Sequence, residues 1–132
     1  MIQHNRKQIL VVDDDLSILK LLSFILAKEY DVVTKSSGIE AFGWLEEGHY
    51  PELIISDLEM PYFHGTSFIR NLKISGFYRD TPVIVLSGSY DLQEQVKKMS
   101  FSVEGYLTKP FNPAGLKAII QEVFNNIKEY DL

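Results

Sequence analysis

The chain has 132 residues, of which 45% are hydrophobic, and this length and composition fit one folded domain with a core of its own. Thirteen basic residues against eighteen acidic ones give a formal net charge of −5, which disfavours direct binding to nucleic-acid phosphates. Cysteine is absent, so disulfides and thiolate metal sites are excluded. The polar N-terminal residues and the lack of a long apolar run predict a cytoplasmic protein without membrane contact.

Short β-branched and apolar runs alternate with longer stretches of helical periodicity along the chain. The run QILVV predicts a buried first strand over 8–12, and leucines at spacings of three and four predict a helix around 19–26. A short strand over 31–34 and a helix over 38–47 come next. The remaining predicted elements, in chain order, are a strand over 52–56, a helix over 66–75, a strand over 82–87, a helix over 91–100, a strand over 104–108 and a helix over 116–127.

Each of the five predicted strands is followed by a helix, and this order determines the fold class. Strands joined through helices pair in parallel, and right-handed crossovers place the helices on both faces of the sheet. We therefore expect a three-layer, doubly wound α/β sandwich in a single domain spanning 1–132, with its core over about 8–127. Functional sites of such folds form beyond the carboxyl ends of the strands.

Polar and charged residues directly follow three of the predicted strands and end a fourth, so we expect them along one edge of the sheet. The residues are Asp13, Asp14, Asp57, Ser87 and Lys109. Three carboxylates at one edge require a cation, and oxygen ligands without nearby histidine or cysteine indicate Mg²⁺ or a similar ion. An acid cluster, a separate aspartate, a hydroxyl and a lysine together are typical of a phosphoryl-transfer site in which an aspartate is the nucleophile.

The third acid of the run, Asp15, has a simpler explanation. Aspartate is favoured at the residue before a helix, where its carboxylate accepts hydrogen bonds from the first free N–H groups and interacts favourably with the helix dipole. We therefore interpret Asp15 as a helix cap and assign the metal-binding role to Asp13 and Asp14.

Four motifs occur in order: ILVVDDD, LIISDLEMP with Gly65 after it, VIVLSG, and GYLTKPF. Together they resemble the receiver domain of two-component response regulators over residues from about 8 to about 127, which is nearly the whole chain. The resemblance implies a flavodoxin-like (βα)5 fold with strand order 2-1-3-4-5.

The resemblance also implies a role for each matching residue. Asp57 would accept a phosphoryl group from the phosphohistidine of a sensor histidine kinase or phosphotransfer protein. Mg²⁺ would be held directly by Asp14, through metal-bound water by Asp13, and by Asp57 and the main-chain carbonyl of Glu59. Lys109, in a Lys109–Pro110 bond that is usually cis in the family, would contact the acyl phosphate.

Ser87 and Tyr106 match the residues that report phosphorylation in the family. Ser87 would move toward the phosphoryl group, and Tyr106 would turn inward beside it. The face formed by the fourth helix, the fifth strand and the fifth helix would then bind a downstream protein target or a second copy of the chain. The protein would act as a signalling phosphoacceptor that assists its own phosphotransfer and dephosphorylation, and not as an enzyme acting on other substrates.

Two alternatives remain open at this point. The segment VVDDDLS also matches the nucleophile motif of haloacid-dehalogenase-like phosphatases, in which Asp13 would attack and Asp15 would act as acid and base. That family needs further acids after its lysine, whereas here only Glu122, Glu129 and Asp131 follow Lys109. The second alternative is a receiver-like interaction module that works without phosphorylation.

Overall fold

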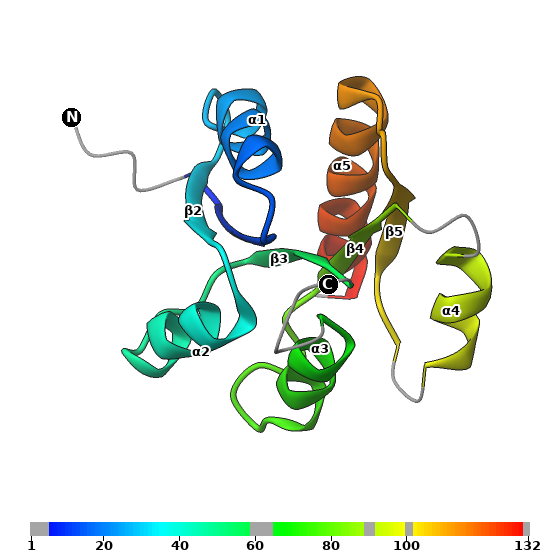
Figure 1. Cartoon of the computed structure of the whole chain (residues 1–132). Helices are drawn as coiled ribbons and strands as arrows, with labels where there is room; N and C mark the ends of the chain where they lie inside the picture. The colour runs from blue at the N-terminus through cyan, green and yellow to red at the C-terminus, as the bar shows by residue number, and fades with distance from the viewer. Residues whose placement is uncertain (1–5, 59–64, 89–91, 100–101, 131–132) are drawn as a thin grey trace.

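The computed structural model describes residues 6–58, 65–88, 92–99 and 102–130, and within them strands and helices alternate along the chain (Figure 1). The strands are β1 (Gln8–Val12), β2 (Asp31–Lys35), β3 (Leu53–Asp57), β4 (Val83–Ser87) and β5 (Gly105–Thr108). The helices are α1 (Leu16–Leu26), α2 (Gly38–Glu46), α3 (Gly65–Ile74), α4 (Leu92–Lys98) and α5 (Pro113–Tyr130).

All strand pairs in the five-stranded sheet are parallel, and the strand order is β2-β1-β3-β4-β5. This confirms the order 2-1-3-4-5 implied by the resemblance. β2 lies on one side of β1, and the chain then crosses to the other side to form β3. As a result, β1 and β3 lie side by side at the centre of the sheet. Every residue of β3 and of β4 is buried, as expected for strands covered on both faces.

The core consists of two layers, one on each face of the sheet, because successive side chains of a strand point to opposite faces. In β1, Leu10 and Val12 pack in the layer that contains residues of α2, α3 and α4. Ile9 and Val11 pack in the other layer, with residues of α1 and α5. Figure 1 shows α1 and α5 on one side of the sheet and α2 and α3 on the other.

Most elements begin or end one to three residues away from their predicted bounds, and for one of them a single side chain explains the difference. The last helix begins at Pro113, earlier than the predicted 116, because Asn112 caps it: the Ala114 N–H donates to Asn112 Oδ1 at 2.7 Å. The fourth helix was expected over 91–100, but α4 ends at Lys98. No helix in the described ranges combines the length and the apolar character that crossing a membrane requires.

Candidate functional site

The residues predicted from the sequence to share one edge of the sheet do so. Asp13 and Asp14 follow β1, Asp57 is the last residue of β3, and Ser87 is the last residue of β4. Lys109 directly follows β5. Because β1, β3, β4 and β5 are consecutive neighbours in the parallel sheet, their carboxyl ends bring these side chains together.

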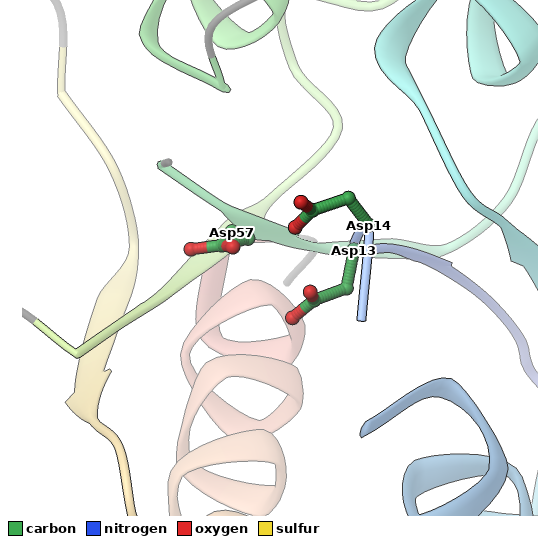
Figure 2. A group of neighbouring side chains, drawn as sticks. All are labelled: Asp13, Asp14 and Asp57. Carbon is green, nitrogen blue, oxygen red and sulfur yellow. The ribbon is translucent and has the colours of Figure 1, made fainter. Parts of the chain in front are cut away.

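The carboxylates of Asp13, Asp14 and Asp57 form a cluster in which one oxygen of each lies within 4.8 Å of the others (Figure 2). Asp13 and Asp57 are buried, with 1% and 4% of their surface exposed, whereas Asp14 is exposed. Three negative charges this close repel one another, and burial strengthens the repulsion. A set made of carboxylate oxygens, open to solvent on one side, fits a hard divalent cation such as Mg²⁺.

Lys109 supplies a positive charge at this cluster. Its ammonium Nζ lies 2.8 Å from Asp13 Oδ2, within hydrogen-bond distance, and 3.4 Å from Asp57 Oδ2. The lysine therefore bridges the two buried carboxylates and partly offsets their charge.

The protonation of Lys109 follows from these contacts. Burial lowers the pKa of the Lys109 amine, but the hydrogen bond and charge of Asp13, together with the charge of Asp57, raise it further than burial lowers it. The net shift is upward, so the amine stays charged at neutral pH. A raised lysine pKa stabilises the folded state at every pH below the value for an unfolded chain, and this contribution disappears as the pH rises through the folded-state pKa.

Main-chain hydrogen bonds hold the strand ends that carry the site. The Lys109 N–H donates to the Ser87 carbonyl at 2.7 Å, and the Asp13 N–H donates to the Lys35 carbonyl at 3.2 Å. The Lys109–Pro110 peptide bond is cis, as the resemblance implies. Ser87 is fully buried beside the cluster.

Asp15 lies outside the carboxylate cluster and caps α1, as predicted. Its carboxylate accepts a hydrogen bond from the Ser17 N–H at 2.9 Å, and its own N–H donates to Asp13 Oδ1 at 2.9 Å. Asp15 thus fixes the start of the helix and the orientation of Asp13. This arrangement disfavours the phosphatase alternative, because there Asp15 would have to reach the reacting group as acid and base.

The other residues named from the sequence lie farther from the cluster or outside the described ranges. Glu59, the expected main-chain metal ligand, lies outside the described residues. Tyr106 is in β5 with 39% of its surface exposed. The pairing of Lys109 with Asp13 was not predicted, because the resemblance assigns Lys109 to the acyl phosphate. The available signal was that both residues directly follow strands at the same edge of the sheet.

Comparison with known proteins agrees with this architecture. The family described as the response regulator receiver domain matches residues 9–121. The chain is 32% identical over 122 residues to the phosphate regulon transcriptional regulatory protein PhoB of Escherichia coli, covering 92% of this chain and 53% of PhoB. It is 33% identical over 120 residues to the probable transcriptional regulator ycf27 of Cyanophora paradoxa, covering 90% of this chain and 48% of that relative. The chain therefore spans about half the length of these relatives.

Solved structures resemble the chain over most of its length. The chemotaxis response regulator CheY4 of Vibrio cholerae superposes with a TM-score of 0.79 at 31% sequence identity, covering 90% of this chain and 99% of CheY4. A response regulator receiver domain protein from Clostridium thermocellum gives a TM-score of 0.82 at 29% identity, covering 94% of this chain and 98% of that one.

Proposed function

The chain belongs to the response regulator receiver family of two-component signalling, and on that premise we propose that Asp57 is its phosphorylated residue. The observation that carries the proposal is the position of Asp57: buried at the end of β3, in a cluster with Asp13 and Asp14, and 3.4 Å from the Lys109 ammonium. A carboxylate oxygen of Asp57 would form a new P–O bond as the P–N bond of a phosphohistidine breaks, and the imidazole would keep the electron pair.

We assign Mg²⁺ to the carboxylates of Asp13, Asp14 and Asp57, with the main-chain carbonyl of Glu59 as a further ligand. The ion would offset the repulsion between these carboxylates and the incoming phosphoryl oxygens. Lys109 would exchange its contact with Asp13 for one with a phosphoryl oxygen, since its ammonium already lies near Asp57. The same groups would assist the later hydrolysis of the acyl phosphate.

Intact-protein mass spectrometry tests whether the chain is a phosphoacceptor. Incubation with acetyl phosphate and Mg²⁺ should add a single phosphoryl group, because Asp57 is the one proposed acceptor. Mg²⁺ is required because an anionic donor cannot approach three clustered carboxylates without charge compensation. The same incubation with a chelator in place of Mg²⁺ is the control and should add none. An unlabelled protein in Mg²⁺ would instead favour the module that works without phosphorylation, and rapid turnover of phosphate esters would favour the phosphatase.

We further propose that Ser87 and Tyr106 transmit the phosphorylated state to the surface. A ligand shifts a two-state equilibrium only through contacts that differ between the states. The buried Ser87 hydroxyl would gain phosphoryl oxygens as acceptors, and its movement would open space for the half-exposed Tyr106 ring. The surface of α4, β5 and α5 would then bind a downstream protein or a second copy of the chain more tightly.

NMR amide shifts can test this coupling. With Mg²⁺ and beryllofluoride, which mimics a phosphoryl group, shifts should spread through residues 88–111 in the parent protein. In Ser87→Ala the same addition should shift the loops around Asp14 and Asp57 while the shifts near Tyr106 shrink, because the variant lacks the hydroxyl that makes the differential contact. Equal shifts near Tyr106 in the two proteins would contradict the role of Ser87.

The partners that supply and read the phosphoryl group are proposed by chemical class alone. A sensor histidine kinase or a phosphotransfer protein is the donor that the family implies. The two relatives compared above are a transcriptional regulatory protein and a probable transcriptional regulator.

A further inference from the structure

The strand β2 forms one edge of the sheet, beside β1 and far from the surface formed by α4, β5 and α5. Within the described residues no strand pairs with its outer side. Exposed strand edges carry main-chain groups that can pair with another chain, so proteins usually protect them with charges or cover them. β2 carries a charge at each end, Asp31 and Lys35, and three uncharged residues between them.

The direction of each main-chain group in β2 follows from its contacts with β1. The Asp31 N–H donates to the Lys7 carbonyl, and the Lys35 carbonyl accepts from the Asp13 N–H, so residues 31 and 35 bond inward. Main-chain directions alternate along a strand with a period of two. Val33 therefore also bonds inward, and the N–H and carbonyl groups of Val32 and Thr34 point outward from the sheet.

This alternation fits antiparallel pairing of β2 with the same strand of a second copy, centred on Val33. Val33 would lie opposite its own counterpart as a pair without hydrogen bonds between them. Val32 would lie opposite Thr34 of the second copy, and these are the residues whose main-chain groups point outward. Antiparallel ladders alternate between these two kinds of pair, so the inward and outward groups of β2 fall in the required order.

The same register also pairs opposite charges. At one end of the ladder Asp31 would lie opposite Lys35 of the second copy. At the other end Lys35 would lie opposite Asp31 of the second copy. These are pairs without main-chain hydrogen bonds between them, in which side chains lie closest. In parallel pairing at the same register, by contrast, like charges would meet at both ends.

The helix that covers β2 presents an apolar surface beside this edge. Leu16 and Phe24 of α1 are 62% and 72% exposed, and with Lys20 and Thr34 they line a groove of about 720 Å³. Because α1 runs antiparallel to β2, a two-fold axis through Val33 would place the Leu16 end of one α1 beside the Lys28 end of the other. The apolar side chains of both helices would then cover the seam between the sheets.

We propose that β2 is a self-association edge, through which two copies of the chain join their sheets antiparallel about Val33 with Asp31 opposite Lys35. Sedimentation velocity at low ionic strength tests the register. The parent should form dimers as its concentration rises, whereas Asp31→Lys and Lys35→Asp should each weaken dimerisation at least about tenfold, since each places like charges opposite one another at both ends.

Mixing the two variants provides the decisive experiment. In an Asp31→Lys chain paired with a Lys35→Asp chain, opposite charges face each other again at both ends, so the equimolar mixture should recover heterodimers with an affinity within about threefold of the parent. Circular dichroism of each variant shows whether its fold is intact. Parent chains that stay monomeric, variants that dimerise as the parent does, or folded variants whose mixture fails to associate would each overturn the proposal.

Discussion

Replacing Asp57 with asparagine is expected to abolish phosphorylation by acetyl phosphate while leaving the fold intact. The amide has nearly the shape of the carboxylate but lacks the anionic oxygen that attacks phosphorus. The Asp13 carboxylate cannot substitute well, because it already accepts hydrogen bonds from Lys109 and from the Asp15 N–H. We expect the labelling rate to fall at least about a thousandfold, equivalent to ~4 kcal/mol in the barrier.

The matched control for this variant is Asp80→Asn. Asp80 is exposed and precedes β4, so it lies at the amino ends of the strands, opposite the site at their carboxyl ends. It makes the same chemical change and should be labelled at the parent's rate, as measured by the intact mass over time. The Asp57→Asn protein should also be no less stable than the parent toward urea without metal, since one of three clustered negative charges is gone. Undiminished labelling of Asp57→Asn would show that another residue is the phosphoacceptor.

The fold could be predicted largely because its elements carry strong local signals. The all-apolar runs around Leu10, Ile54 and Ile84 have the composition of strands covered on both faces, and all three residues are fully buried. The ends of elements were harder to place, because they depend on single side chains. Glu104 was assigned to the last strand, but β5 begins at Gly105; the Glu104 carboxylate accepts hydrogen bonds from the Val83 N–H at 2.6 Å and from Lys73 at 3.1 Å.

The membership of the site was also predictable, whereas its internal contacts were not. Strand order alone places Asp13, Asp57 and Lys109 at the carboxyl ends of the strands, regardless of the conformation of their side chains. Which carboxylate the lysine contacts depends on side-chain geometry and on the charge at the site, and neither is encoded in the spacing of motifs. The contrast between the buried Asp13 and the exposed Asp14, adjacent in sequence, likewise arises only when the chain turns after β1.

Two of the three consecutive acids after β1, Asp14 and Asp15, should affect different properties of the protein when each is replaced by alanine. Asp14→Ala is expected to weaken Mg²⁺ binding at least tenfold, or about 1.4 kcal/mol, because it removes one of three clustered carboxylates and the one open to solvent. Its stability without metal should be unchanged or higher, since mutual repulsion in the cluster decreases.

Asp15→Ala is the matched control, since it removes a neighbouring carboxylate of the same chain segment that lies outside the cluster. It should bind Mg²⁺ within about twofold of the parent, because charges outside the ligand set contribute little through solvent. It should lose about 1 kcal/mol of unfolding free energy, because the Ser17 N–H loses its cap. Calorimetric Mg²⁺ titration and urea unfolding measure the two effects separately. If Mg²⁺ affinity fell equally in both variants, long-range charge would explain the binding; if it fell only in Asp14→Ala, that carboxylate is a ligand of the ion.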